Sequence, residues 1–316
     1  MPASPTPPRL AASAGFTLLE LLVVIGVISV LLGIGLGYLG RTDPEMVARS
    51  VLAGELRKAQ MTARAEGVPT EVLVVPGADG EAASVRSRVL EPVAAFHFEP
   101  DTPVLDERMR PELAGEDVAA GRFGHARRAG DEDARPLLRW PLVPLLADLR
   151  EGFVLRVDLF LERRGTCLVA EMDPLLELRL DDDLYPQARV RLTGVGDDSL
   201  RVRVAGRRAL PLLRWTTLEV GCDGREVWLA IDGREVGRAA GAGAPKQPDD
   251  MVLDLSPPDA AVPGLVDELR LLAFAYTPAQ LLPIELQPRR PFRFTFDARG
   301  EPVLAPEIVY EDLEDS

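Results

Sequence analysis

A long apolar run close to the N-terminus constrains this chain more than any other feature. Between Phe16 and Leu39 the only charged side chain is that of Glu20. A helix over these residues would rise about 36 Å at ~1.5 Å per residue, which is enough to cross a hydrocarbon core of ~30 Å. The run therefore predicts a membrane-spanning helix at residues 16–39.

Two ordinary explanations of this run are incomplete. A cleaved secretory signal has a shorter apolar stretch, of ~7–15 residues, followed by a small-x-small cleavage site, and no such site follows directly here. A plain membrane anchor fits the length but does not explain Glu20. A carboxylate inside an apolar span is costly and usually has a function.

The hexapeptide GFTLLE at residues 15–20 resembles the signature of type IV prepilins. The resemblance implies that a prepilin peptidase cleaves after Gly15 and that the new N-terminal residue, Phe16, is N-methylated. It also implies that Glu20 pairs with the terminal amine of a neighbouring pilin or pseudopilin, and a buried carboxylate does need a charged partner. The leader departs from the family in carrying a single charged residue, Arg9, where family leaders are usually more basic.

The resemblance also implies a location. A protein of this class is a single-pass protein of the inner (cytoplasmic) membrane with its body outside the cytoplasm, and assembly would place it in a pilus or pseudopilus. The formal net charge of −14 argues against nucleic acid as a partner, because phosphate binding needs a basic face.

A second helix and a strand pair are expected after the span. Asp43 suits the N-cap and Pro44 the first helical position, residues 45–66 are amphipathic, and Gly67 ends the helix. The segment TEVLVV and a run at 83–90 are expected to pair as a hairpin. The helix and hairpin resemble the start of the GspH/FimT-type minor pseudopilins, and PFRFTFDARG near the chain end resembles their ending.

The segment between these two pieces is too long for a pilin loop, and its sequence pattern is typical of β-strands. Short apolar-alternating runs bounded by Gly, Asp and Pro predict strands. Many short strands with little helix favour a β-sandwich. The strands are expected at 153–161, 167–172, 175–180, 187–193, 199–204, 216–223, 226–231, 234–239 and 266–275.

Four pieces of the segment resemble the laminin-G-like and concanavalin-A-like jelly rolls. They are AAFHFEPDTPVLDE, AGRFGHARRAG, RWTTLEVGCDGREVWLAIDGREVGRA and GLVDELRLLAFAYTPAQL. The resemblance implies a jelly roll that binds a glycan or a protein, and one calcium ion in many members of the family.

The chain as a whole is expected to be an α+β protein with a long N-terminal hydrophobic helix, a small pilin-like β element and a large antiparallel sandwich. The expected parts are a leader at 1–15, a pilin helix at 16–67, a hairpin at 68–92, the jelly roll at 93–285, and a C-terminal pilin-like strand with an acidic tail at 286–316.

Several residues in the sandwich invite a structural interpretation. Trp215 and Trp228 lie in strand patterns and are expected in the core rather than as a ligand platform. Asp232–Gly233 is a favoured two-residue hairpin turn. Glu268 or Arg270 is expected in a buried ion pair.

Catalytic signals are weak. Some jelly rolls of this class are endoglycanases, and the nearest match to their carboxylates is Glu171, Asp173 and Glu177. A glycosidase needs two carboxyls flanking the scissile bond. Pro174 breaks the strand and the spacing departs from the family's, so we expect no enzyme activity. Nothing resembles a nucleophile–base pair, a P-loop or a dinucleotide motif.

Metal and disulfide predictions remain open. The acidic loops offer weak calcium candidates, and solvated turns are the alternative. These candidates are Asp181, Asp183, Asp197 and Asp198. No Cys/His cluster suits zinc, and no other cofactor is expected. Cys167 and Cys222 either form one disulfide or are two buried thiols.

Two functions from different classes fit these features. The first is an assembly protein, a minor pilin or pseudopilin of a type II secretion or type IV pilus system that displays a laminin-G-like binding head. The second is a membrane-anchored glycan- or protein-binding module that is not built into a filament.

Overall fold

The computed structural model describes residues 43–77, 81–99, 107–129, 134–143, 145–194, 199–247, 250–284, 288–303 and 307–308. The predicted leader and membrane span, with Gly15, Phe16 and Glu20, lie outside these residues, so their roles stay predictions. No helix in the described ranges combines the length and the apolarity that a membrane crossing requires.

Helix α2 (Pro44–Glu66) has the boundaries that its capping residues predict. The Asp43 side chain accepts a hydrogen bond from the backbone N–H of Glu45 at 3.1 Å, and Pro44 occupies the first turn. Gly67 ends the helix in the left-handed conformation, with φ of 64°, which glycine adopts without a steric penalty. The sequence prediction for this helix is confirmed.

Strands make up most of the rest of the described residues, which also contain short 3₁₀ turns at Glu107–Met109 and Pro258–Ala260. Each strand expected within the sandwich is present, with its ends shifted by at most two residues. The strands are β1 (Thr70–Val75), β2 (Ser84–Phe96), β3 (Glu112–Leu113), β4 (Glu116–Gly121), β5 (Gly124–Arg128), β6 (Leu138–Leu142), β7 (Phe153–Leu161), β8 (Cys167–Met172), β9 (Leu176–Leu180), β10 (Pro186–Thr193), β11 (Ser199–Ala205), β12 (Trp215–Cys222), β13 (Glu226–Ile231), β14 (Arg234–Ala240), β15 (Met251–Leu255), β16 (Gly264–Tyr276), β17 (Gln280–Leu281), β18 (Phe292–Phe296) and β19 (Glu307–Ile308).

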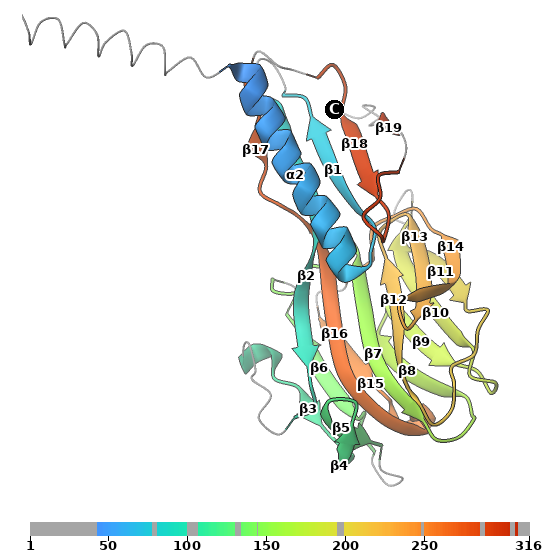
Figure 1. The fold of residues 1–316 in the computed structure, drawn as a ribbon. Coiled ribbons are helices and arrows are strands. Elements are labelled where there is room, and N and C mark those ends of the chain that lie inside the picture. The colour runs from blue at the N-terminus through green and yellow to red at the C-terminus, as the bar shows by residue number, and fades with distance from the viewer. Residues whose placement is uncertain are drawn as a thin grey trace, which may run out of the picture.

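These strands form two sheets with antiparallel pairing (Figure 1). The first sheet has the order β14-β13-β12-β7-β16-β2-β1-β18-β19, with β17 added to β2 and the β4–β5 hairpin added to β16. The second sheet has the order β11-β10-β9-β8-β15-β6-β3. The two sheets pack face to face as the expected antiparallel β-sandwich.

Two long strands belong both to the sandwich and to the smaller unit that α2 covers. β2 pairs with β1 through its first residues and with β16 from Arg88 to Phe96. β16 in turn pairs with β7 in the sandwich. Figure 1 shows β2 and β16 running from beside α2 down into the sandwich. The boundary expected between residues 92 and 93 therefore falls inside β2, and one sheet spans both units.

Three apolar clusters correspond to this architecture. The largest fills the space between the two sheets and includes the fully buried Phe153, Leu155 and Leu178. A second lies under α2, where Ala59 and Ala63 face the strands of the small unit. The third lies between the two units and consists of Val68, Leu90, Val154, Trp228, Leu272 and Phe274.

The two tryptophans have different environments. Trp228 is 6% exposed in the third cluster, which confirms its expected burial. Trp215 is only partly buried and packs against Phe160, with ring centroids 5.6 Å apart. Because Trp215 lies opposite Phe160 on the outer face of the first sheet, the expectation that it belongs to the core is wrong.

A buried carboxylate fastens α2 to the first sheet. Glu55 is 3% exposed and accepts hydrogen bonds from Ser87 on β2 at 2.5 Å and from Gln280 on β17 at 2.8 Å. The Thr277 hydroxyl lies 3.3 Å away, as a further donor. Removing this acceptor would deprive the buried hydroxyls of Ser87 and Thr277 of their charged partner, which is costly.

We therefore expect Glu55→Ala to lower the free energy of unfolding by about 2–3 kcal/mol, measured by urea denaturation of the detergent-solubilised chain. The control is Lys58→Ala at an exposed position of the same helix, which should change it by less than about 0.5 kcal/mol. Equal effects of the two substitutions would contradict this role of Glu55.

Candidate functional site at the junction of helix α2 and the sandwich

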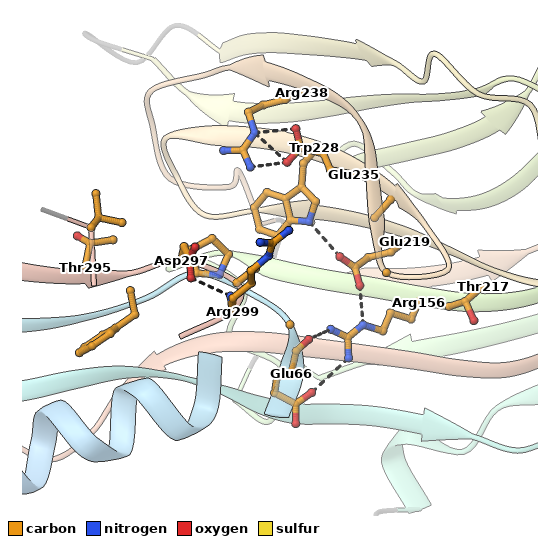
Figure 2. Close-up of a pocket in the computed structure, with 17 residues that line it drawn as sticks. Glu66, Arg156, Thr217, Glu219, Trp228, Glu235, Arg238, Thr295, Asp297 and Arg299 are labelled. Carbon is orange, nitrogen blue, oxygen red and sulfur yellow. Dashed lines mark hydrogen bonds and ion pairs between the residues drawn. The ribbon is translucent and has the colours of Figure 1, made fainter. Parts of the chain in front are cut away.

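A hollow lies where the end of α2 meets the outer face of the first sheet. Its volume is about 550 Å³. The residues that line it come from the end of α2, from β7, β12, β13 and β14, and from the segment that includes and follows β18. We call it the junction hollow (Figure 2).

The alternation of β7 explains which side chains reach this hollow. Leu155, Val157 and Leu159 are fully buried and point into the core, so Arg156 and Asp158, which alternate with them, point to the outer face. Arg156 lies directly opposite Glu219 on β12. Arginine and aspartate in an otherwise apolar strand were the sequence signal for this site, and the sequence prediction missed it.

Glycine makes room for the tryptophan that forms the wall of the hollow. Gly221 lies opposite Trp228 in the β12–β13 pair. A Cβ atom on Gly221 would lie 2.1 Å from the Trp228 ring, so only glycine allows the indole to lie across β12. The indole thereby reaches the polar groups of the hollow with its N–H.

A chain of charge-assisted contacts crosses the hollow, as Figure 2 shows. The indole N–H of Trp228 donates to Glu219 Oε1 at 3.0 Å, and Arg156 Nε donates to Glu219 Oε2 at 2.7 Å. Arg156 also donates through Nη1 to Glu66 Oε2 at 3.2 Å and through Nη2 to the Glu66 carbonyl. Glu66 is the last residue of α2, so this chain connects the helix end to the sandwich.

A second cluster of charged and polar groups fastens β1 to the sandwich. Glu71 on β1 is 3% exposed. Its Oε2 lies 2.8 Å from Arg225 Nη2 and 3.2 Å from Arg293 Nε, and the Tyr276 hydroxyl donates to its Oε1. Burial and the neighbouring Glu71 carboxylate raise the pKa of Tyr276, so this phenol stays a donor. The residues come from four segments far apart in the sequence.

A smaller hollow of about 240 Å³ adjoins the first along the outer face. Within it Asp158 Oδ1 lies 2.8 Å from Arg122 Nη1 and accepts a hydrogen bond from the Thr217 hydroxyl at 2.6 Å. Burial raises the pKa of Asp158, which its polar partners partly offset. Glu268 is 7% exposed and lies 3.1 Å from Arg270 Nη2, so Glu268 is the buried member of the expected ion pair, whereas Arg270 is exposed.

Asp267 connects two of the sequence pieces that suggested the jelly roll. It is fully buried, and its Oδ2 accepts hydrogen bonds from the backbone N–H groups of Arg122 at 2.8 Å and Phe123 at 3.3 Å. These two residues form the β4–β5 turn, so the carboxylate holds that hairpin against β16. Burial raises the pKa of Asp267, and the N–H donors act in the opposite direction.

The arrangement at the junction hollow is suited to holding parts together. The charged groups that cross it, Glu66, Arg156 and Glu219, are partners of one another, and Arg238 at its rim pairs with Glu226 and Glu235. No nucleophile–base pair is formed by the described residues that line it. The site couples α2 and the strands that it covers to the sandwich in one orientation.

The carboxylates considered for glycoside hydrolysis lie elsewhere. Glu171 on β8 is directly opposite Glu177 on β9, on the outer face of the second sheet, and Asp173 lies in the turn between them. Glu177 pairs with Arg189 at 2.8 Å and also with Arg179. The structure thus brings Glu171 and Glu177 together, but places them among arginines.

The acidic turn at 181–183 uses its carboxylates to build the turn. Asp181 accepts from the backbone N–H of Tyr185 at 2.9 Å, Asp182 accepts from the Thr166 hydroxyl at 2.6 Å, and Asp183 pairs with Arg164 at 2.9 Å. In the described part of the chain, no group of three or more His, Cys, Asp or Glu side chains is placed to hold a metal ion. The other two calcium candidates, Asp197 and Asp198, lie outside the described residues.

The two cysteines are free and buried. Cys167 lies on β8 of the second sheet and Cys222 on β12 of the first, and because both thiols are free, the disulfide considered from the sequence is not formed. Burial raises the pKa of each thiol to about 12. The alternative of two buried thiols describes the structure.

The N-terminal part of the chain is similar to a known family. Residues 10–36 match the model of the prokaryotic N-terminal methylation motif. The chain carries a prepilin-type N-terminus. The matched segment contains Gly15, Phe16 and Glu20, and it indicates a pilin or pseudopilin. A comparison with curated proteins finds no match.

Solved structures similar to this chain are distant. Domain 4 of AbnA, a GH43 extracellular arabinanase from Geobacillus stearothermophilus, in complex with arabinotriose, is 18% identical, with 60% of this chain and 95% of that chain covered and a TM-score of 0.41. Endo-β-1,4-glucuronan lyase from the fungus Trichoderma reesei is 7% identical, with 58% and 95% covered and a TM-score of 0.38. Domains LG4-5 of the mouse laminin α1 chain are 19% identical, with 44% and 38% covered and a TM-score of 0.30. Such low scores assign no ligand or activity to this chain.

Arg156 should be the residue on which the junction depends most. Arg156→Met keeps the length of the side chain but leaves the buried Glu219 with one partner fewer, and it frees the end of α2. We expect the free energy of unfolding to fall by about 2–4 kcal/mol, measured by denaturant titration.

The matched control is Arg238→Met at the rim of the same hollow. Arg238 is 41% exposed, and ion pairs exposed to solvent contribute little, so its loss should cost less than about 1 kcal/mol. If Arg156→Met were no more destabilising than Arg238→Met, the coupling role of Arg156 would be wrong.

The raised thiol pKa values predict chemical inertness. Because the thiolate is the reactive form, neither cysteine should be alkylated by iodoacetamide in the folded protein at pH 8. After denaturation without a reductant, mass spectrometry should show both thiols alkylated. One unlabelled pair in the denatured chain would show a disulfide, and labelling of the folded chain would show that the thiols are accessible.

Proposed function

We propose that the protein is a prepilin-type assembly subunit, a minor pilin or pseudopilin of a type II secretion or type IV pilus system, that displays a β-sandwich binding head. The observation that carries the proposal is the methylation motif at residues 10–36. Within it, cleavage after Gly15 would create the N-terminal Phe16, and Glu20 would accept the terminal amine of the neighbouring subunit.

The fold supports a role in display. Helix α2 begins at Pro44, shortly after the apolar run ends at Leu39. The sandwich is continuous with the strands that α2 covers, and Arg156 joins the two. A head held in this way would keep a fixed direction relative to the membrane-anchored helix, which is what presentation of a ligand site on a filament requires.

The proposed division of the chain follows from this role. Residues 1–15 would be removed, 16–67 would form the assembly helix, 68–92 and 286–316 would complete a pilin-like unit, and 93–285 would form the head. The body would lie outside the cytoplasm, anchored in the inner membrane. Its partners would be the prepilin peptidase, other pilins or pseudopilins, and a glycan or protein ligand of the head.

We propose a binding role for the head rather than an enzymatic one. Hydrolysis of a glycosidic bond needs two available carboxyls, one that donates a proton and one that acts as base or nucleophile. Of the two carboxylates that face each other on β8 and β9, Glu177 is ion-paired with two arginines. Incubating the purified chain with a panel of polysaccharides and measuring reducing ends should show no release above that of a buffer blank.

Processing gives the direct test of the N-terminus. We expect Gly15→Ala to leave full-length precursor in the membrane fraction, because the peptidase would no longer accept the site. The product is measured by mass spectrometry of the N-terminal peptide, which in the parent chain should begin at a methylated Phe16. Normal cleavage of the Gly15→Ala chain would overturn the proposal.

Assembly needs a separate variant, because an anchored but unassembled protein would also be cleaved. Glu20→Ala should be processed normally but excluded from sheared filaments, and Glu20→Asp should be excluded less strongly. If Glu20→Ala entered filaments as the parent chain does, Glu20 would not be the assembly group. If the parent chain itself were absent from filaments, a membrane-anchored binding module would describe the protein better.

A further inference from the structure

The outer face of the second sheet concentrates arginine, although the chain is acidic overall. Alternation along β10 and β11 explains the placement. Val190, Val202 and Val204 point into the core, so the arginines that alternate with them point outward. We call this surface the arginine face. It consists of Arg179 on β9, Arg189 and Arg191 on β10, and Arg201 and Arg203 on β11.

Strand register sets like charges against each other on this face. Arg189 lies directly opposite Arg203, and Arg191 lies directly opposite Arg201, in the β10–β11 pair. Like charges directly opposite in an antiparallel pair destabilise it. Packing of the two sheets does not require arginine at these outward positions, so the repulsion has no structural benefit.

Internal partners neutralise only part of this charge. Glu177 accepts a hydrogen bond from Arg189 Nη1 at 2.8 Å and is ion-paired with Arg179. The other three arginines of the face have no ion pair among the described residues. The Nε atoms of Arg189 and Arg191 are buried without a hydrogen-bond partner there. Because Arg201 and Arg203 are exposed and have no ion pair there, the face offers positive charge to a ligand.

The arginine face is also hollowed. Two hollows of about 280 Å³ and 160 Å³ share Glu177 and Arg189, so they adjoin across β9 and β10. The smaller one also contains Glu171, which has no ion pair among the described residues. The described residues that line the two hollows include no aromatic side chain, so a ligand here would be held by charge and hydrogen bonds.

The mixture of groups indicates the chemistry of the ligand. Guanidinium forks match carboxylates with two parallel hydrogen bonds. Glu171 and Glu177, set among the arginines, would repel a ligand that carried only anionic groups, but they accept hydrogen bonds from hydroxyls. A ligand with both carboxylates and hydroxyls satisfies both kinds of group. We propose that the arginine face binds an acidic polysaccharide whose sugar units carry carboxylates.

The proposal rests on the binding role proposed for the head and adds the place and the chemical class of the ligand. It does not depend on cleavage at Gly15 or on assembly through Glu20. Failure of the test below would therefore leave those two processing results intact, and failure of processing would leave this binding result intact.

The test measures binding of the detergent-solubilised full chain to immobilised polygalacturonate by biolayer interferometry. We expect the double variant Arg201→Gln/Arg203→Gln to bind at least tenfold more weakly. Raising the salt concentration should also weaken binding, because the screening length falls to ~10 Å at 0.1 M ionic strength. Both arginines are exposed. The variant should melt at or above the temperature of the parent chain, since repulsion across the strand pair is removed.

The matched control is Arg163→Gln/Arg208→Gln, which removes the same charge at two exposed positions outside the arginine face. It should bind within twofold of the parent chain, and fully methyl-esterified polygalacturonate should not bind. Three results would overturn the proposal. The first is no binding of polygalacturonate, and the second is an equal loss in both double variants. The third is poly-L-glutamate binding as tightly as polygalacturonate, which would point to an acidic peptide.

Discussion

The shared strands β2 and β16 are the constraint on which the rest of the structure depends. Each has 13 residues, and each contributes to the small unit under α2 as well as to the sandwich. Backbone hydrogen bonds of a continuous sheet resist bending more than a peptide linker does, so the two units cannot turn freely about each other. The side-chain clusters around Arg156 and Glu71 strengthen this connection, because they hold the helix end and β1 to the sandwich.

The buried polar groups at the junction add specificity to this continuous sheet. Charges buried beside a sheet are costly unless they are paired, and Glu219, Glu71 and Glu55 are each held by two or more donors. Their positions in sequence are far from those of their partners. They therefore specify one arrangement of helix and sheets, which an apolar contact of similar area would specify less tightly. A prepilin-type subunit with such a junction would carry its head in a fixed direction.

Much of the fold could be predicted from local signals. Asp43, Pro44 and Gly67 define α2 through capping rules that act within a few residues, and alternation located the strands of the sandwich. The role of Glu268 was also readable, because a carboxylate beside an arginine in an apolar strand needs a partner. The expected boundary at 92–93 fell inside β2, because a strand that pairs with different neighbours along its length has no local mark where the neighbours change.

The candidate site was harder to predict, since its contacts join residues between about 9 and 205 positions apart. Periodicity says that Arg156 faces outward, but not that Glu66 lies beside it. The face of Trp215 was misjudged for the same reason. An aromatic in a strand can lie on either side of a sheet, and only the register with Phe160 decides.

The central claim is that the sandwich is fixed relative to helix α2. Spin labels at Lys58→Cys on α2 and at Arg163→Cys in the sandwich test it most directly, since both positions are exposed and the native thiols are buried. Pulsed electron–electron double resonance on the full chain should give one narrow distance distribution. A broad or two-peaked distribution would contradict the account.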